Sequence, residues 1–469
     1  MGIPIPEPAK WTIAIDVGST TTKGACFRRR ATGSAGGLDL LAVEHAPTTV
    51  EKPFEDVTFG LEDVLQRLGR AAGETFAAKR PDVLLVATSS AGGGLQVVAC
   101  GTTQRFSASA ASQAALGAGA IVLATLSPDD GRTLGQRADL VRDLRPDMVL
   151  MSGGFDGGGA PPFLAELADL FLTARPKPRL GEGFRLPLLF AGNDPGFELV
   201  DDVLGPDFVV QRAPNLIPGP DRQNPGPVRE AIHLLFQEHV MSHAPGYAKL
   251  LARAGAPVLP TPGAVAKAVE LAAAHFRRDV LAFDIGGATT DVFSVVSGRF
   301  GRTVSANLGL SYSALNVLNR AGIDGILRWL PSGHDPAAVT AAVANKTIHP
   351  TTLPETVFDL EVEHALAREA LRLALEDHLS VTGDGLRRGG RPLLVIGSGG
   401  VLSFAPRRAQ AIRILTDAVG GTRPLEVAVD DRFLLPQVGV LSTAAPDLAL
   451  DVLLKHSLKW SDREDVVGG

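Results

Sequence analysis

The sequence predicts an α/β protein made of two lobes of the same design, each with an inserted subdomain. Short apolar runs of strand length end in glycine-rich turns along the whole chain, which holds 52 Gly. A strand-turn-strand motif at residues 11–27 recurs at 280–296, as expected of a duplicated unit. The length of 469 residues allows two or three domains at ~150 residues each.

Composition narrows the class of protein. Hydrophobic residues make up 45% and charged residues 20%, which is typical of a folded globular chain. The net charge of −6 comes without a basic block, so we expect no nucleic-acid partner. Cys26 and Cys100 are too few for a disulfide framework, and no apolar run approaches ~18 residues. With no signal-peptide pattern at the start, these features predict a cytoplasmic protein without a membrane partner.

The first lobe begins with an apolar strand at 11–16. The strand ends in a hydroxyl-rich turn, and the chain resumes through Lys23 to Phe27. A third strand at 40–44 and an amphipathic helix at 59–68 follow. This order predicts an antiparallel meander that opens an α/β lobe.

Three later strands in this half also run into glycine-rich turns, at residues 82–94, 147–158 and 186–194. Turns of this kind mark the carboxyl ends of sheet strands, the edge that usually faces ligands in α/β proteins. The turn Ser152–Gly158 fits a ligand or partner site and close helix packing equally well. We expect a first lobe over 1–260 with an insertion at about 90–240.

The second lobe is expected over 261–469. A helix at 262–276 leads into the repeated motif at 280–296, and a further strand at 392–397 runs into another glycine turn. The mainly helical stretch at about 309–385 interrupts this lobe as an inserted subdomain would. It is the first candidate for a partner surface.

The repeated turns carry the chemistry. Asp16 and Asp284 each end an apolar strand directly before glycine and hydroxyl residues. Such turns offer backbone N–H groups and hydroxyls to phosphates, and hydrated Mg²⁺ takes one or two carboxylates plus phosphate oxygens. For a single turn, an aspartate that only stabilises the backbone explains the pattern as well. Two copies plus a third glycine turn favour a Mg·ATP site.

The predicted site residues fall into three groups. The candidate catalytic residues are Asp16, Asp284 and Asp291, of which Asp16 and Asp284 are also the candidate metal ligands. The candidate nucleotide-binding residues are Gly18, Ser19, Thr20, Thr21, Lys23, Gly286, Gly287, Ala288, Thr289, Thr290, Gly397, Ser398, Gly399 and Gly400. Lys23 faces the phosphates or lies on the sheet surface, and both interpretations stay open.

Other phosphate-binding and catalytic motifs are missing. No strand is followed by the Gly-Lys-Ser/Thr of a P-loop, and no Rossmann Gly-x-Gly-x-x-Gly occurs in a usable context. Gly-x-Ser-x-Gly in a strand-turn-helix context is also absent, so acyl-transfer chemistry is not expected.

The order of the motifs resembles the actin/Hsp70/sugar-kinase ATPase superfamily. Residues 16–21 look like its first phosphate loop, 284–291 like the second, and Gly397–Gly400 like the adenosine motif. Residues 259–266 and 435–442 sit where the superfamily has its two connecting helices. The resemblance implies two actin-like (ribonuclease H-like) lobes with a nucleotide cleft between them.

Within that superfamily the chain resembles, over nearly its full length, the MutL/GlmL family of glutamate mutase accessory proteins. The segments that carry this resemblance are residues 16–23, 89–93, 152–158, 309–312 and 345–347. The resemblance implies an ATPase-like protein with ATP and Mg²⁺ as cofactors, which assists or reactivates an adenosylcobalamin-dependent mutase. A homodimer is left open.

The chain departs from Hsp70-like members at the first connecting helix. Those proteins begin this helix with a Glu that places Mg²⁺ and water, whereas residues 260–262 here contain no carboxylate. Asp284, Asp291 or Asp156 is left as the candidate base, and slow hydrolysis or a conformational switch fits better than fast turnover. Two alternatives stay open: a small-molecule kinase with Asp156 as its base, and a nucleotide-binding scaffold without hydrolysis.

Overall fold

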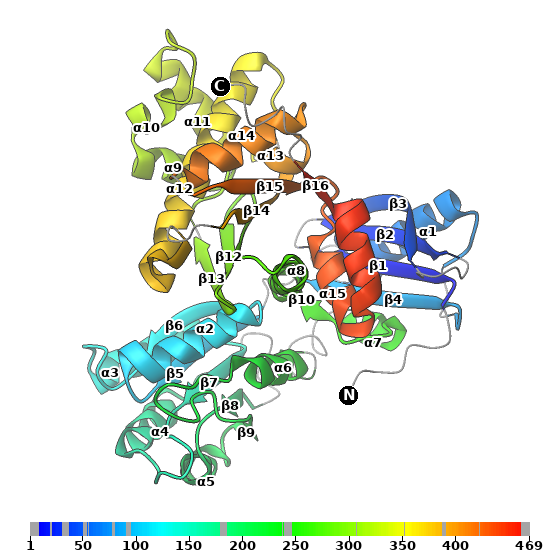
Figure 1. The fold of residues 1–469 in the computed structure, drawn as a ribbon. Helices are drawn as coiled ribbons and strands as arrows, with labels where there is room; N and C mark the ends of the chain where they lie inside the picture. Colours follow the sequence, from blue (N-terminus) through cyan, green and yellow to red (C-terminus); the bar gives the residue numbers. More distant parts are fainter. Residues whose placement is uncertain are drawn as a thin grey trace. The chain divides into compact units, whose positions relative to one another are not determined.

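The computed structural model forms two compact units, residues 1–264 and 265–469. Figure 1 shows their helices and strands in sequence colours. The residues that the structure describes are 9–18, 21–30, 37–49, 54, 56–76, 80–90, 95–178, 185–236, 238, 246–305, 307–350, 352–386, 391–421 and 423–460.

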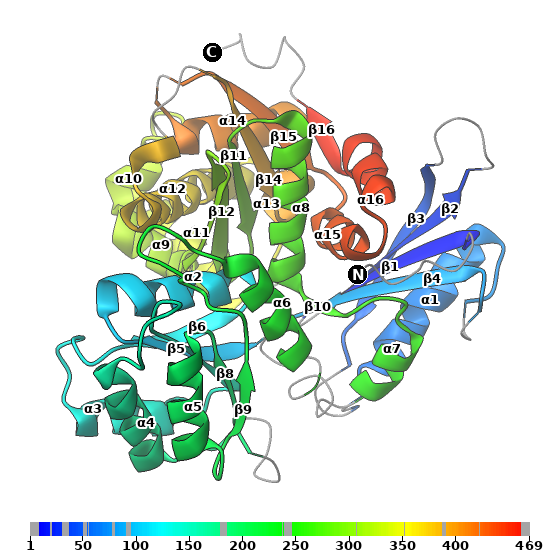
Figure 2. The ribbon, with the colours of Figure 1, turned by 60° about the horizontal axis from the view of Figure 1, so that its bottom comes forward.

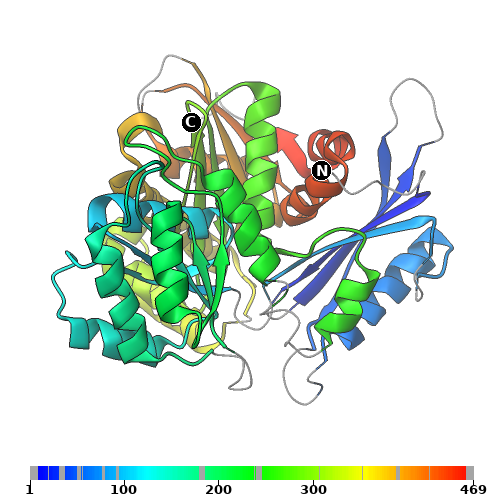
Figure 3. The same cartoon turned by 90° about the horizontal axis from the view of Figure 1, so that it is seen from below.

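The first unit opens with a five-stranded sheet in the order β10-β4-β1-β2-β3. Its strands are β1 (Trp11–Val17), β2 (Thr21–Arg29), β3 (Leu38–Pro47), β4 (Val83–Ser89) and β10 (Leu259–Pro260). β1 to β3 form an antiparallel meander, and β4 and β10 run parallel to β1. Helices α1 (Thr58–Ala72) and α7 (Tyr247–Arg253) lie side by side against this sheet (Figure 3).

A second sheet is inserted between β4 and β10. Its strands are β5 (Gln96–Gly101), β6 (Ile121–Leu126), β7 (Met148–Ser152), β8 (Pro187–Phe190) and β9 (Val209–Arg212). All of them are parallel, in the order β6-β5-β7-β8-β9. The helices that cover its two faces are α2 (Ser109–Gly117) and α6 (Pro225–Leu235) on one, and α3 (Leu134–Leu144), α4 (Pro162–Ala174) and α5 (Asp194–Leu204) on the other (Figure 1).

The two sheets of the first unit share one apolar core. Trp11 and Ile13 of β1 belong to the same buried cluster as Val97 of β5, Ala111 of α2 and Val228 of α6. The opposite face of the inserted sheet has a separate core with α3, α4 and α5. The insertion is therefore packed onto its lobe through one face.

The second unit holds a six-stranded sheet in the order β13-β12-β11-β14-β15-β16. Its strands are β11 (Val280–Ile285), β12 (Thr290–Val296), β13 (Arg299–Ser305), β14 (Leu393–Ser398), β15 (Leu425–Asp430) and β16 (Leu458–Trp460). Its helices are α9 (Ala314–Ala321), α10 (Ile323–Leu327), α11 (Pro336–Ile348), α12 (Val357–Thr382), α13 (Gly400–Ser403), α14 (Arg408–Val419), α15 (Leu435–Ala444) and α16 (Pro446–Val452). Helix α8 (Thr261–Phe276) crosses the division between the units.

Both units repeat one topology. In each, three strands form an antiparallel meander, and the next two strands in that sheet run parallel to the first. Numbered along the chain, both sheets read 3-2-1-4-5, and the second unit adds β16 at its edge. This is the strand order of an actin-like, ribonuclease H-like lobe, so the predicted fold class is confirmed.

Helices α9 to α12 occupy the stretch between β13 and β14 and gather beside β11 and β12 (Figure 2). α12 is held at its start by Thr356 and Asp359, which form a reciprocal capping box. Its buried residues include Leu366, Ala370 and Leu371, which pack into the core of the second unit. The helical segment therefore shares the lobe's core.

Element boundaries differ modestly from expectation. β3 runs over Leu38–Pro47 rather than 40–44. Helix α6 begins at Pro225, and proline suits the first turn of a helix. Within the described residues, none of the helices has the length and apolar character needed to cross a membrane.

His378 makes the stability of the second unit sensitive to acid. Its ring is buried and contacts the hydroxyls of Ser294 (2.8 Å) and Thr303 (3.0 Å). Burial lowers the pKa of His378 to about 4. Because the unfolded chain binds the proton more readily, stability should fall as the pH drops below about 6.5, by about 2 kcal/mol between pH 7 and pH 5.

Urea unfolding at pH 7 and pH 5 measures this fall. The variant His378→Gln should lose less stability over this interval than the original chain. His349→Gln, at an exposed position, is the matched control and should change nothing. An equal loss in the His378→Gln variant and the original chain would contradict the assignment.

Candidate functional site

The first acidic turn joins β1 to β2. Asp16 lies opposite Lys23 in the antiparallel register, so both side chains share one face of the sheet. The N–H of Gly18 donates to the carbonyl of Thr21 at 3.1 Å and closes the turn. Ser19 and Thr20, two of the predicted phosphate-binding residues, lie outside the described residues.

The Asp16 carboxylate is only 6% exposed and is positioned by two hydroxyls. Its Oδ1 accepts from Thr88 Oγ1 at 2.8 Å and from Thr261 Oγ1 at 2.7 Å. Thr88 is its direct neighbour on β4, and Thr261 is the first residue of α8. Two of the hydrogen bonds that a buried carboxylate needs are thus supplied by neutral donors.

A buried tyrosine supports the same turn from behind. Tyr247 Oη and Ser89 Oγ are 2.5 Å apart, and Ser89 Oγ donates to the carbonyl of Val17 at 3.3 Å. Burial raises the pKa of Tyr247 to about 12, so the phenol stays neutral at ordinary pH. This chain of hydroxyls links α7 and β4 to the strand that carries Asp16.

The second acidic turn joins β11 to β12 in the same way. Asp284 lies opposite Asp291, and the N–H of Gly286 donates to the carbonyl of Thr289 at 2.9 Å. Gly287 and Ala288 form the tip. The closing hydrogen bond therefore joins corresponding residues in both turns.

The segment after the third strand braces each turn. In the first unit Thr48 Oγ1 donates to the carbonyl of Gly18 at 2.8 Å and lies 2.9 Å from Thr22 Oγ1. In the second, the N–H of Leu310 donates to the carbonyl of Gly286 at 3.1 Å, and Thr290 Oγ1 donates to the carbonyl of Leu308 at 2.5 Å. The repeat thus extends from the sequence to the hydrogen bonds that hold the tips.

Lys23 and Asp291 occupy corresponding places in the two hairpins, each opposite the strand aspartate of its own unit. Asp291 accepts from Arg302 Nη2 at 2.6 Å and from Nε at 2.9 Å, and the Arg302 side chain is 1% exposed. A buried guanidinium needs this counter-ion. The geometry favours a structural role for Asp291 over the water-orienting role considered from the sequence, and phosphate contact by Lys23 stays a prediction.

The third predicted turn, Gly397–Gly400, lies beside the second acidic turn. Ser398 is the parallel-strand neighbour of Asp284. Gly399 has a φ of 118°, and a Cβ there would lie 2.2 Å from the carbonyl oxygen of Ile285. Only glycine allows this approach. Two motifs that are far apart in the sequence are therefore joined at one edge of the second sheet.

A further acidic residue ends β15 and was missed by sequence reasoning. Asp430 is completely buried, and its carboxylate accepts from the N–H groups of Leu434 (3.0 Å) and Leu435 (2.9 Å) and from Ser457 Oγ (2.9 Å). Burial raises the pKa of Asp430 to about 6. The two N–H groups lie at the start of α15 (Leu435–Ala444), the helix expected from the resemblance at 435–442, so Asp430 joins the end of β15 to that helix.

Asp156, the third candidate base, belongs to the turn after β7 in the inserted sheet. Its Oδ1 accepts from Asn215 Nδ2 at 2.7 Å, and its N–H donates to the carbonyl of Pro218 at 3.1 Å. The structure thus assigns it to a different turn from those of Asp16 and Asp284. The segment 89–93 of the resemblance is described only as far as residue 90.

The oxygen atoms at these turns could hold Mg²⁺ only together with a bound ligand that supplies further oxygen atoms. Within the described part of the chain, no three His, Cys, Asp or Glu side chains gather so as to hold a metal by themselves. Asp16 and its hydroxyl neighbours are hard oxygen donors, which Mg²⁺ prefers, and this ion completes its shell with water and phosphate oxygens. The residues therefore fit a metal that arrives with a phosphate ligand.

Two lobes of 3-2-1-4-5 topology, each with an aspartate before a closed glycine turn, define an actin-like two-lobed protein. A model of the family described as MutL protein matches residues 12–457, and the chain belongs to this family. The predicted resemblance is thereby confirmed. Protein MutL of Clostridium tetanomorphum is 27% identical over 485 residues, which cover 95% of this chain and 99% of that protein.

Solved structures with similarity to the chain include a sugar kinase and a carboxylase. Xylulose kinase from Rhodospirillum rubrum is 16% identical, with a TM-score of 0.36 over 97% of this chain and 95% of the kinase. Nucleotide-free acetone carboxylase, from a study of ATP-dependent acetone carboxylation, is 14% identical, with a TM-score of 0.37 over 92% of this chain and 70% of that chain.

Proposed function

We propose that this MutL-family chain binds one Mg·ATP through both acidic turns. The observation that carries the proposal is the matched closure and bracing of the two turns at Gly18 and Gly286. Asp16 and Asp284 would hold Mg²⁺ through its waters, and the turns would offer N–H groups and hydroxyls to the phosphates. Bound Mg²⁺ would supply positive charge to the triphosphate.

The adenosine is assigned to the turn Gly397–Gly400. Its position beside Asp284, together with the glycine required at 399, supports this assignment. An open glycine turn next to a phosphate loop allows a flat base to approach the backbone. Ser398 and Gly400 would then flank the nucleoside.

We further propose that nucleotide binding serves an adenosylcobalamin-dependent mutase of the glutamate mutase type, which this protein assists or reactivates in the cytoplasm. This role rests on the family resemblance. The start of α8 offers the Asp16 carboxylate a hydroxyl from Thr261 instead of a second acid. That arrangement favours slow hydrolysis or a nucleotide-dependent change of state over fast turnover, and it keeps the non-hydrolysing scaffold as the second candidate.

The helical subdomain of the second unit is the proposed contact surface for the mutase. Five large apolar residues at its surface are more than half exposed: Tyr312, Ile348, Leu353, Val357 and Val381. Exposed apolar groups on a folded protein often mark an interaction surface. A small-molecule kinase would not need this surface, because its second substrate binds beside the phosphates.

A pull-down with an adenosylcobalamin-dependent glutamate mutase, with and without Mg·ATP, tests the proposed function. We expect capture of the mutase to change at least tenfold with Mg·ATP, and to disappear in a chain with Ile348→Ser and Leu353→Ser. Capture that is absent under both conditions would contradict the accessory role. ATP consumption that rises with a hydroxylated metabolite and not with the mutase would favour the kinase.

A further inference from the structure

The inserted sheet has the topology of a complete ligand-binding domain. Numbered within the insertion, its parallel strands stand in the order 2-1-3-4-5. In doubly wound domains of this order, ligands bind outside the carboxyl ends of the strands where the order reverses, which here is between β5 and β7. A fold alone does not fix a function, so the residues at this edge decide whether it can bind a ligand.

An aromatic pair stands at the reversal point. Phe106 lies on the π-helical turn Gln104–Ala108 that follows β5, and Phe155 lies on the turn after β7. Their rings meet edge to face at 6.2 Å, yet the residues are 39% and 41% exposed. Single π-helical turns occur frequently at functional sites. The pair offers an apolar surface to a flat ring.

The turn after β7 leaves its backbone open. Gly154 and Gly157 have φ values of 86° and 76°, which explains glycine there on conformational grounds. Gly192 is explained by packing, since a Cβ would lie 2.1 Å from the carbonyl oxygen of Gly153. Neither backbone conformation nor packing explains the glycine at position 159. The φ of Gly159 is not left-handed, and a Cβ there would meet nothing within 4 Å. Its bare backbone fits the approach of a ligand.

Two asparagines hold this turn in place without a ligand. Asn193 Nδ2 donates to the carbonyls of Phe155, Gly158 and Gly159 at 3.0–3.1 Å. Asn215 Nδ2 donates to the carbonyl of Gly154 at 3.0 Å as well as to Asp156. A turn that is already ordered loses little entropy when a ligand binds.

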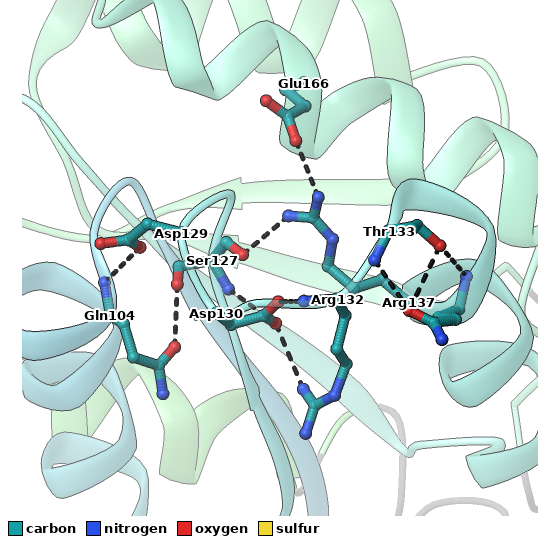
Figure 4. Close-up of polar contacts among 9 residues, drawn as sticks. Gln104, Ser127, Asp129, Asp130, Arg132, Thr133, Arg137 and Glu166 are labelled. Atoms are coloured by element: carbon teal, nitrogen blue, oxygen red, sulfur yellow. Dashed lines mark hydrogen bonds and ion pairs between the residues drawn. The ribbon is translucent and has the colours of Figure 1, made fainter.

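On the β6 side of the edge, several polar side chains are bonded to neighbouring loops and helices (Figure 4). The N–H of Gln104 donates to Asp129 at 2.7 Å, and Ser127 Oγ donates to Gln104 Oε1 at 2.8 Å. Arg137 is bound to the carbonyl of Ser127 and to Glu166. The loops there are tied to one another, so the β7 side is left for a ligand.

A cavity of about 470 Å³ opens on the β7 side. Its lining residues are Asp156, Gly157, Gly158, Gly192, Asp194, Pro195, Arg212 and Asn215. Two carboxylates, one guanidinium and one amide provide both acceptors and donors, and Arg212 already forms an ion pair with Asp194. This mixed lining suits hydroxyl groups better than a phosphate, and acidic side chains bind ribose hydroxyls in related α/β domains.

We propose that the inserted sheet carries a second ligand site, distinct from the acidic turns, for a flat heteroaromatic ring on a neutral, hydroxylated arm. The ring stacks on Phe155 beside Phe106. The arm enters the cavity along Gly157 and Gly158, where the Asp156 carboxylate accepts from its hydroxyls. Riboflavin and adenosine are compounds of this kind and serve as probes.

Calorimetry with each probe tests this site, with Mg·AMP-PNP present in excess so that any other nucleotide site is filled. We expect at least one probe to bind with a Kd below 1 mM. Phe155→Ala and Asp156→Ala should each weaken that binding tenfold or more. Phe404→Ala, a matched change at an exposed phenylalanine of the other unit, should leave it unchanged.

Two results would overturn the proposal: neither probe binds the original chain, or Phe155→Ala and Asp156→Ala both leave the Kd unaltered while circular dichroism shows the native fold. The variant Asp284→Asn separates this site from the proposed function. It should keep probe binding even where Mg·ATP binding is lost.

Discussion

Replacing Asp284 or Asp16 with Asn is expected to weaken Mg·ATP binding at least 100-fold, or about 3 kcal/mol. Asparagine keeps the size of the side chain but removes the charge that we propose faces the metal. Magnesium holds its few protein ligands mainly through carboxylate charge, so a neutral amide is a poor substitute. Titration calorimetry with ATP, in Mg²⁺ and in EDTA, measures the loss.

Both substitutions need controls for folding and for unspecific charge effects. Asp324→Asn changes an exposed aspartate in the first turn of α10 and should leave the affinity unchanged. Thermal unfolding of all three variants should show native-like transitions. If Asp284→Asn bound Mg·ATP as tightly as the original chain, the second turn would not be part of the site. The same result for Asp16→Asn would exclude the first turn.

Gly399→Ala is expected to destabilise the second unit by about 3 kcal/mol or more and to abolish Mg·ATP binding. The added methyl group would lie 2.2 Å from the carbonyl oxygen of Ile285, and the φ of 118° is unfavourable for any side chain. Relief requires the turn to move away from the strand that carries Asp284. Urea unfolding and calorimetry measure the two effects.

The neighbouring glycine provides a matched control. A Cβ at Gly400 would meet nothing within 4 Å, and this residue begins α13, where alanine is the better helix former. Gly400→Ala should therefore stay within ~0.5 kcal/mol of the original chain. Equal stabilities of the two alanine variants would contradict the close approach at Gly399.

Much of the fold could be predicted because its signals are local. The apolar strand before Asp16 and its copy before Asp284 specify two hairpins, and their order along the chain suffices to indicate two related lobes. Prolines and glycines marked where helix α8 begins and where β14 ends. Hydrophobic period and turn chemistry act over a few residues, so the sequence displays them directly.

The partners of the site residues could not be predicted because they depend on register and packing. Thr88 reaches Asp16 only because β4 pairs with β1 in one parallel register, and Thr261 arrives from a helix far along the chain. Arg302 meets Asp291 only once β13 lies beside β12. The sequence alone also gave no sign that the insertion has a 2-1-3-4-5 order, since strand order follows from long-range contacts.

A crystal structure of the chain with Mg·AMP-PNP is the most direct test of the central claim. The proposal predicts one nucleotide per chain, whose Mg²⁺ and phosphates lie within hydrogen-bonding reach of both the Asp16 and the Asp284 turns, with adenosine at Gly397–Gly400. A nucleotide bound by only one of the two turns, or two nucleotides bound one at each, would contradict it.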